Sequence, residues 1–242
     1  MVPVILLHGF VGSPKNWRRV IQAWPGAPEP VALPLPGHHR DHPAAPDWDT
    51  NVERVAAMVP AGAVAVGYSM GARLALALLA ADRISAAVLV SGHTGLSAPG
   101  ERAARATSDA AWAALLREKG MPAFLQRWEA QPMFATQRRV ERLRSYRRLD
   151  RLGHDPEELA RSLETMGLVV MPDLRPALVA RAARAHLVVG ADDEAYLARA
   201  RALVAEAPAL GLDVLPECGH DPTLEQPTAL ANAAAAAIAR WT

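Results

Sequence analysis

Short apolar runs recur along the chain, separated by segments in which apolar residues follow a helical spacing. The strongest runs lie at residues 2–7, 63–66, 84–90 and 186–189. A weaker run at 31–35 is interrupted by Pro34 and followed by Pro36, and a last short run occupies 212–215. Short continuous runs of this kind are typical of strands buried on both faces of a parallel sheet.

Helices are predicted between these strands. The segments with helical spacing are 14–24, 49–59, 72–81, 196–207 and 226–241. Ser13 is placed to cap the first helix, with Pro14 at its first position, and Asp49 or Thr50 is placed to cap the second. Strands and helices that alternate in this way form a mostly parallel α/β sheet with right-handed crossovers and helices on both faces.

The alternation stops at residue 98 and resumes at 185. Between these points the sequence predicts several helices broken by glycine and proline. We therefore expect an α/β core made of 1–97 and 185–242, with a helical lid at 98–184 inserted between two strands. Lids of this kind shape the substrate pocket and exclude water from it.

Charge is nearly balanced overall, at +1, so no global field favours nucleic acid or a membrane surface. The balance is uneven along the chain, because residues 100–184 carry 16 Arg and Lys against 11 Asp and Glu. All cations except Lys15 and Lys119 are arginines. Guanidinium groups suit the recognition of carboxylates, although many arginines simply form a solvated helix face.

The cysteine count and the first residues bear on the compartment. Cys218 is the single cysteine, which excludes an intramolecular disulfide and suits a reducing environment. The apolar run at 2–7 is too short to span a bilayer and no charged segment precedes it. We expect a soluble cytoplasmic protein that contacts neither nucleic acid nor membrane.

The sequence Gly67-Tyr68-Ser69-Met70-Gly71 stands between a predicted buried strand and a predicted helix. It matches the G-x-S-x-G nucleophile elbow, in which a sharp turn exposes a serine hydroxyl at the carboxyl edge of a sheet. Glycines flank the serine because the turn leaves no room for side chains. The pattern predicts a nucleophile or base at Ser69.

An acid and a histidine follow in the order that this fold requires. Asp192 and Asp193 come after the predicted strand at 186–189, and His220 comes after the one at 212–215. A histidine can accept the serine proton near neutral pH, and an aspartate fixes its tautomer. We predict the triad Ser69, Asp193 and His220, and we prefer Asp193 to Asp192 because it lies three residues past Gly190.

The loop after the first strand, His8-Gly9-Phe10, is where a serine hydrolase places one oxyanion-hole amide. The backbone N–H groups of Phe10 and Met70 are therefore the candidates. The cluster of His38, His39 and His42 invites a metal interpretation, which we disfavour because adjacent histidines point apart and no further ligand pattern accompanies them. No metal or organic cofactor is expected.

Further motifs carry a more specific resemblance. They are Arg73 four residues after the serine, Ser91-Gly92-His93-x-Gly95-Leu96, Glu101-Arg102-x-x-Arg105-x-x-Ser108-Asp109-x-x-Trp112, Trp128-x-x-Gln131-Pro132-x-Phe134, Leu143-Arg144-Ser145 and Pro172-Asp173-Leu174. Together with the elbow, they resemble the 2-succinyl-6-hydroxy-2,4-cyclohexadiene-1-carboxylate synthase family of the α/β-hydrolase fold. The resemblance covers nearly the whole chain, including the predicted lid.

This resemblance implies a lyase of menaquinone biosynthesis. The family eliminates pyruvate from 2-succinyl-5-enolpyruvyl-6-hydroxy-3-cyclohexene-1-carboxylate, with the triad serine as the base. By position, Arg73, Arg105 and Arg144 would hold the carboxylates of this small polycarboxylate substrate. Tyr68 and Trp128 would form walls of the pocket.

Two other functions fit parts of the sequence. A carboxylesterase or C–C-bond hydrolase would use the same triad through an acyl-enzyme at Ser69. A ligand-binding member without catalysis is disfavoured by the intact triad. The arginine set favours the lyase, since a simple esterase has no use for three buried guanidinium groups. We expect the other lid arginines, among them Arg102, Arg138, Arg139, Arg147 and Arg148, to lie on solvated helix faces.

Overall fold

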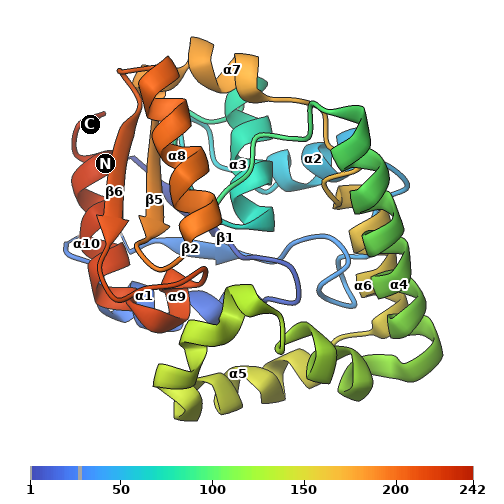
Figure 1. Cartoon of the computed structure of the whole chain (residues 1–242). Helices are drawn as coiled ribbons and strands as arrows, with labels where there is room; N and C mark the ends of the chain where they lie inside the picture. Colours follow the sequence, from blue (N-terminus) through green and yellow to red (C-terminus); the bar gives the residue numbers. More distant parts are fainter. Residues whose placement is uncertain (1, 27–28, 242) are drawn as a thin grey trace.

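A computed structural model of the chain describes residues 2–26 and 29–241. Within these residues, six strands form one sheet in the order β2-β1-β3-β4-β5-β6, and every neighbouring pair is parallel (Figure 1). The strands are β1 (Val4–Leu7), β2 (Val31–Leu33), β3 (Val64–Tyr68), β4 (Ala86–Val90), β5 (Ala185–Gly190) and β6 (Gly211–Leu215). The predicted parallel α/β fold is confirmed.

The strand order places β3, which leads to Ser69, in the interior of the sheet. β1, β3, β4 and β5 are buried along their whole length, whereas Val31 and Val214 on the edge strands are exposed. β2 ends at Leu33 because Pro34 cannot donate a ladder hydrogen bond. The carboxyl ends of parallel strands meet at one edge of a sheet, so the loops after β1, β3, β5 and β6 converge there.

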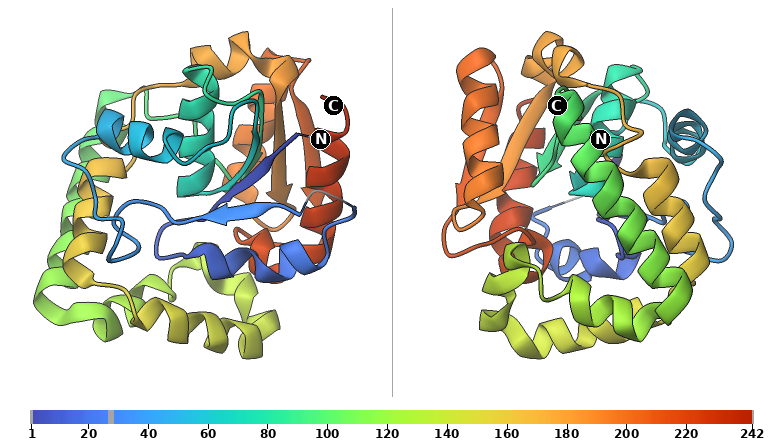
Figure 2. Two further views of the ribbon diagram at one scale, coloured as in Figure 1. Left: turned by 180° about the vertical axis from the view of Figure 1, so that it is seen from behind. Right: turned by 45° about the vertical axis from the view of Figure 1, so that its right-hand side comes forward.

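Helices cover both faces of the sheet (Figure 2). On one face, α1 (Arg18–Gln22) and α10 (Pro227–Ile238) bury Val20 and Leu230 against the strands, and Trp17, directly before α1, packs in the same cluster. On the other face lie α2 (Trp48–Ala56), α3 (Met70–Ala80) and α8 (Glu194–Glu206), which belong to a second apolar core. This layering explains why the inner strands read as continuous apolar runs.

Some helix boundaries differ from those expected. The first helix begins as a 3₁₀ turn, η1 (Pro14–Trp17), and the Ser13 side chain makes no capping hydrogen bond. The expected cap of α2 was wrong, because Asp47 caps it by accepting a hydrogen bond from Thr50 N at 2.7 Å. The last helix starts at Pro227, after the separate short helix α9 (Pro222–Glu225). A residue before proline is disfavoured in the helical conformation, so Gln226, which precedes Pro227, separates the two helices.

The chain between β4 and β5 contains α4 (Pro99–Trp128), η2 (Pro132–Val140), α5 (Glu141–Leu152), α6 (Pro156–Met166), α7 (Arg175–Ala180) and η3 (Ala182–Arg184). Helix α4 bends at Gly120, which has φ of 66°, two residues before Pro122. In Figure 1, α4 and α6 run along one side of the core, and α5 lies beyond the carboxyl ends of the strands.

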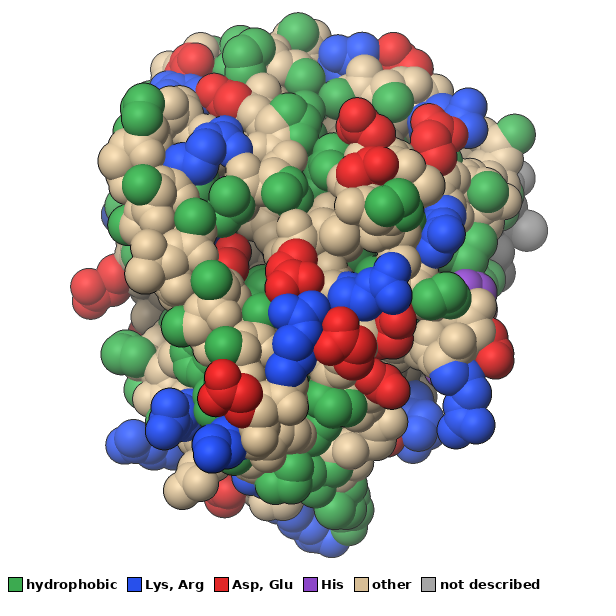
Figure 3. Space-filling model, turned by 90° about the vertical axis from the view of Figure 1, so that its right-hand side faces the viewer, with side chains coloured by type: hydrophobic (Ala, Val, Ile, Leu, Met, Phe, Trp, Pro, Cys, Tyr) green, Lys and Arg blue, Asp and Glu red, His purple; other side chains and the backbone are tan. Residues whose placement is uncertain are grey.

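The insertion has its own apolar cluster and its own ion pairs. Leu116, Phe124 and Leu159 are fully buried where α4 meets α6. On the outer face, Arg117 of α4 binds Glu157 at 2.8 Å and Glu164 at 2.5 Å. Figure 3 shows side chains of both charges mixed over this face. Such exposed pairs contribute little individually, so the apolar cluster is the main source of cohesion.

Candidate active site

The turn at Ser69 has the geometry of a nucleophile elbow. Ser69 follows β3 directly, precedes α3 and has φ of 53° and ψ of −106°. A Cβ on Gly67 would lie 2.3 Å from the carbonyl oxygen of Gly71, and a Cβ on Gly71 would lie 2.1 Å from that of Leu7. Both glycines are therefore required by close backbone approach. The strain at a non-glycine residue with positive φ is characteristic of functional sites.

Ser69, His220 and Asp193 come together as a hydrogen-bonded chain. His220 Nε2 lies 3.3 Å from Ser69 Oγ, and His220 Nδ1 lies 2.7 Å from Asp193 Oδ2. His220 is 1% exposed and Asp193 is 7% exposed. A buried carboxylate on Nδ1 holds the proton there and leaves Nε2 free to accept the serine proton.

The two adjacent aspartates have separate roles. Asp193 is at the start of α8, and its backbone N–H donates to Gly190 O at 3.2 Å. Asp192 lies outside and forms an ion pair of 2.6 Å with Arg139 of the insertion. The structure thus brings Asp193 to His220, as preferred from its spacing, and leaves Asp192 in a surface contact.

Phe10 and Met70 carry the two amides expected to form an oxyanion hole. Both residues line the same cavity as Ser69. Met70 N–H is in the first turn of α3, where helical amides have no intrahelical acceptor. Within residues 2–26 and 29–241, Phe10 N–H makes no backbone hydrogen bond. Their role as donors to an oxyanion near Ser69 stays a prediction.

Two buried histidines, which sequence reasoning did not select, support the loop that carries Phe10. His38 Nε2 accepts a hydrogen bond from Val11 N at 3.2 Å, and His8 Nε2 accepts one from Leu35 N at 3.2 Å. Each ring donates its other proton to a backbone carbonyl, Gly9 O for His8 and Pro36 O for His38. These four bonds need neutral imidazoles, because a protonated ring has no acceptor nitrogen.

We expect the protein to lose stability in mild acid because of His8. Burial lowers the pKa of His8 from 6.5 to about 3. The unfolded chain therefore binds a proton at His8 more readily than the folded chain does. The contribution of neutral His8 to folding stability is complete above pH 6.5 and is lost as the pH falls toward 3. Between pH 7 and 5, the free energy of unfolding should fall by about 1 to 2 kcal/mol more in the wild type than in His8→Asn.

Urea unfolding at the two pH values measures this difference. His39→Asn is the matched control, because the ring of His39 is exposed, and it should keep the wild-type pH dependence. If the free energy of unfolding falls equally in the wild type and in His8→Asn, the folded and unfolded states bind the proton at His8 equally well. This result would contradict the lowered pKa of His8.

Aromatic side chains form the walls of a cavity of about 270 Å³ next to Ser69. Tyr68 is 5% exposed, and Trp128 stacks on Phe124 with ring centroids 5.4 Å apart. Both line the cavity, as the resemblance implies. Sequence reasoning did not select Tyr196, whose ring lies 4.6 Å from that of His220. Such a wall limits water around the imidazole.

Two of the three expected arginines line the cavity. Arg73 is one turn beyond Ser69 on α3, is 6% exposed and donates to Met166 O at 2.8 Å. Burial and the nearby Arg105 lower the pKa of Arg73 to about 10, so it stays charged at neutral pH. Arg105 Nε donates to Asp109 Oδ1 at 2.7 Å, and Arg105 also lines the cavity.

The third arginine, Arg144, is placed elsewhere. Its guanidinium donates to Glu141 Oε2 at 3.1 Å and to Glu129 O at 3.3 Å, and it is not among the cavity residues of the described structure. The residue of α5 that does line the cavity is Arg151. The spacing of arginines along α5 was the available signal, since Arg144, Arg147 and Arg151 follow at intervals of three and four.

The expectation that Arg147 is solvated was wrong. Arg147 is 8% exposed and pairs with Asp221, which is fully buried next to His220. Its Nη1 also lies 3.1 Å from Thr223 Oγ1. Arg147 therefore ties α5 of the insertion to the loop that carries the histidine.

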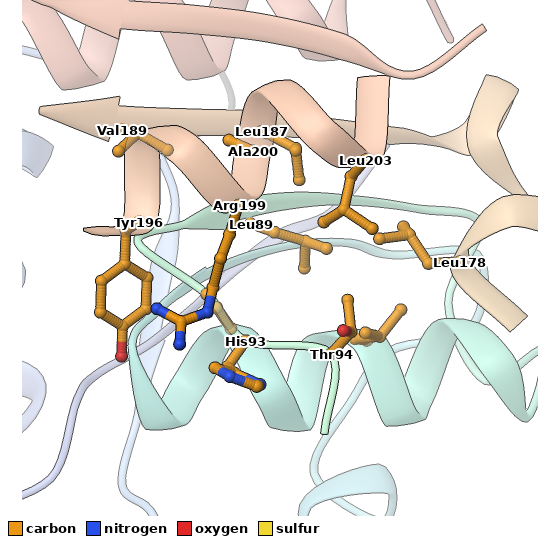
Figure 4. Close-up of a pocket in the computed structure, with 13 residues that line it drawn as sticks. Leu89, His93, Thr94, Leu178, Leu187, Val189, Tyr196, Arg199, Ala200 and Leu203 are labelled. Carbon is orange, nitrogen blue, oxygen red and sulfur yellow. The ribbon is translucent and has the colours of Figure 1, made fainter. Parts of the chain in front are cut away.

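A second, small cavity of about 20 Å³ lies behind His93, between α3 and α8 (Figure 4). In this view the guanidinium of Arg199 lies beside the ring of Tyr196, 5.7 Å from its centroid. His93 lines both cavities and accepts a hydrogen bond from Gly95 N on Nδ1 at 3.1 Å. Burial and the guanidinium of Arg199 lower the pKa of His93 to about 4. His93 is thus a neutral part of the wall near pH 7.

Across 2–26 and 29–241, His, Cys, Asp and Glu form no group of three or more suited to a metal ion. His39 and His42 contact each other at the surface, whereas His38 is buried under the Phe10 loop. Within the same ranges, no helix combines the length and the apolar character needed to cross a bilayer.

The parallel sheet, the strained serine after its interior strand and the buried Asp–His pair define an α/β-hydrolase. A model of the alpha/beta hydrolase family matches residues 4–233, and the chain belongs to this family. Within it, the chain belongs to the 2-succinyl-6-hydroxy-2,4-cyclohexadiene-1-carboxylate synthase family, as its motifs predict.

Two relatives support this assignment, and one solved structure shares the fold. The synthase of Enterobacter sp. (strain 638) is 32% identical over 240 residues, covering 94% of this chain and 88% of that protein. A putative synthase of Bacillus subtilis (strain 168) is 30% identical and covers 93% and 85%. The structure of MenH from S. aureus has a TM-score of 0.91 at 23% identity, covering 99% of this chain and 94% of that chain, which shows the shared fold.

Proposed function

We propose that this protein is a lyase of menaquinone biosynthesis. It eliminates pyruvate from 2-succinyl-5-enolpyruvyl-6-hydroxy-3-cyclohexene-1-carboxylate and gives 2-succinyl-6-hydroxy-2,4-cyclohexadiene-1-carboxylate. The observation that carries this proposal is the opening of the Ser69–His220–Asp193 chain onto a cavity that Arg73 and Arg105 also line. The names of the related synthases support the same reaction.

The reaction begins with removal of the ring hydrogen next to the succinyl carbonyl. Ser69 Oγ takes this proton as its own passes to His220 Nε2, 3.3 Å away, and Asp193 stabilises the imidazolium. The electron pair of the broken C–H bond moves onto the carbonyl oxygen. In this proposal the N–H groups of Phe10 and Met70, two residues of the cavity lining, stabilise that oxyanion.

The elimination follows from collapse of this enolate. A double bond forms from the deprotonated carbon, the existing ring double bond shifts by one position, and the bond from the ring to the enolpyruvyl oxygen breaks. The leaving group departs as the enolate of pyruvate and is protonated on carbon. The imidazolium of His220, which lines the cavity, gives up its proton to this carbon and returns to the neutral resting state.

The charges of the cavity suit a substrate with several carboxylates. A guanidinium binds a carboxylate through charge-assisted, often bidentate hydrogen bonds, which gain strength where water is excluded. Arg73 is already buried, and Arg105 approaches from α4 of the insertion. A small polycarboxylate substrate is therefore part of the proposal, as is the action of residues 98–184 as a lid.

The wider setting also belongs to the proposal. A substrate held by buried arginines needs neither nucleic acid nor a membrane surface as a partner. Cys218, the one cysteine of the sequence, is buried and unpaired in the structure. A cytoplasmic location remains a prediction that rests on this cysteine usage.

We expect Arg105→Ala to raise KM for pyruvate release by about 10- to 100-fold, because a charged hydrogen bond to a substrate carboxylate is lost. The substrate is generated in situ, and pyruvate is followed over a range of substrate concentrations. Arg138→Ala is the matched control, since Arg138 is exposed on the same insertion, and its KM should equal that of the wild type. Unchanged kinetics in Arg105→Ala would show that Arg105 does not bind a substrate carboxylate.

A further inference from the structure

Tyr196 contributes a hydroxyl group to the cavity next to Ser69. It lies in the first turn of α8, three residues after Asp193, and its ring centroid is 4.6 Å from that of His220. In Figure 4 the ring extends away from α8, with the oxygen at its far end. Tyr196 lines both the cavity next to Ser69 and the smaller one behind His93. The side chain therefore has two parts, a ring that packs on the imidazole and a hydroxyl that takes no part in the proton transfers.

The hydroxyl of Tyr196 is free to bind a ligand. Within residues 2–26 and 29–241, no protein group forms a hydrogen bond with it. Water can hydrate this hydroxyl while the cavity is open to solvent, but a ligand that fills the cavity displaces that water. A hydroxyl that loses its water without gaining a new partner costs free energy. A substrate that fits this cavity should therefore offer the hydroxyl a hydrogen-bonding group.

The charges around this hydroxyl indicate which group it meets. Burial raises the pKa of Tyr196, and the charges of Arg73 and Arg105, which line the same cavity, oppose that rise. The carboxylate of Asp193 is also near, but it is already bound to His220. Two guanidinium groups favour a carboxylate of the ligand at this place. An ionised carboxylate has about four acceptor sites, so it can bind guanidinium groups and a phenol at once.

We propose that the Tyr196 hydroxyl donates a hydrogen bond to the substrate carboxylate that Arg73 and Arg105 bind. This inference rests on the proposed function and adds a neutral donor to the two cations of the cavity. The phenol O–H has one direction in which it donates, so it fixes the orientation of the carboxylate as well as its position. Tyr196 is thus a substrate-binding residue, and its ring separately packs on the imidazole of His220.

Tyr196→Phe removes the hydroxyl and keeps the ring on His220. In pyruvate release, KM should rise about 10- to 100-fold, because a hydrogen bond to a charged group is lost, with kcat within about threefold. The melting temperature should equal that of the wild type, since the hydroxyl has no partner among the described residues. Tyr146→Phe is the matched control, because Tyr146 is 63% exposed and absent from the lining of the described cavity. Its KM should equal that of the wild type.

A double-mutant cycle with Arg105→Ala tests whether the hydroxyl and the guanidinium bind the same carboxylate. If they do, each single variant already loosens that carboxylate. The rise in KM of Tyr196→Phe/Arg105→Ala should then be at least about threefold smaller than the product of the two single rises. A rise equal to the product would show that the hydroxyl binds another group of the substrate and would overturn the proposal.

Isothermal titration with citrate, a tricarboxylate probe, separates this inference from the proposed function. Tyr196→Phe should bind citrate about 10-fold more weakly than the wild type does, and Tyr146→Phe should bind it as tightly. If the wild type releases pyruvate, an unchanged KM in Tyr196→Phe overturns the inference and the lyase stands, whether or not kcat falls. If the wild type releases no pyruvate, the lyase is overturned, and an unchanged citrate affinity in Tyr196→Phe then overturns the inference as well.

Discussion

Ser69→Ala should release pyruvate about 10³- to 10⁴-fold more slowly than the wild type, because the group that takes the ring proton is gone. His220 Nε2 is 3.3 Å from Ser69 Oγ and reaches the cavity next to it, so a small residual rate is expected. The variant should remain folded, since among the described residues Ser69 Oγ makes a single hydrogen bond, to His220. Single-turnover kinetics with excess enzyme measure the chemical step directly.

Ser97→Ala is the control for this comparison, because Ser97 is exposed and lies outside the cavity next to Ser69. It should keep the wild-type rate. If Ser69→Ala retains more than about a tenth of the wild-type rate, a base contributing the usual 10² or more cannot be Ser69. The proton would then have to go directly to His220 or to another group.

Gly71→Ala should reduce the free energy of unfolding by about 3 kcal/mol or more, at the upper end for overpacking. The added Cβ would lie 2.1 Å from Leu7 O and 2.6 Å from His8 O. These are backbone atoms of β1 and the following loop, so they cannot move aside as a flexible side chain can. Relief requires β1 and the start of α3 to separate, which also displaces Ser69.

Gly100→Ala provides the matched control. A Cβ at Gly100, in the first turn of α4, would meet no atom within 4 Å. Alanine there should leave stability unchanged or raise it by up to about 1 kcal/mol. Urea unfolding at pH 7 measures both variants. Equal stability of Gly71→Ala and the wild type would show that the backbone at the elbow is not as tightly packed as the structure indicates.

The features that sequence predicted well are those set by near neighbours in the chain. The turn at Ser69 depends on the glycines two positions to either side and on the apolar strand before it. The choice of Asp193 over Asp192 depends on its distance from Gly190, and the structure places Asp193 Oδ2 2.7 Å from His220 Nδ1. The parallel sheet follows from the alternation of strands and helices along the chain.

The features that sequence could not resolve depend on how the insertion packs on the core. Helix α5 has five arginines in twelve residues, and its larger apolar residues Tyr146, Leu149 and Leu152 are exposed, so its apolar positions do not mark the side that faces inward. Its docking buries Arg147 and Arg151 and leaves Arg144 on Glu129 and Glu141. These partners are distant in sequence, as in Arg147 with Asp221. The motif match therefore selected Arg144, whereas the residue of α5 in the described cavity lining is Arg151.

The buried histidines illustrate the same limit. His8 and His38 accept hydrogen bonds from Leu35 and Val11, each 27 residues away. Nothing near either histidine in the sequence indicates that hydrogen bonds connect these two loops. In the structure they fix the backbone around Phe10, which the mechanism uses as an oxyanion donor, and their neutral rings link the order of that loop to pH.

The central claim is that this triad removes a proton and does not form an acyl-enzyme. The most direct test follows pyruvate and the absorbance of the conjugated ring diene together in one single-turnover reaction, with mass spectrometry of the quenched protein. The lyase predicts that pyruvate and diene appear at the same rate and in equal amounts, with Ser69 unmodified. Release of an acid without diene, accompanied by an acyl group on Ser69, would contradict the lyase and establish the hydrolase chemistry of the same fold.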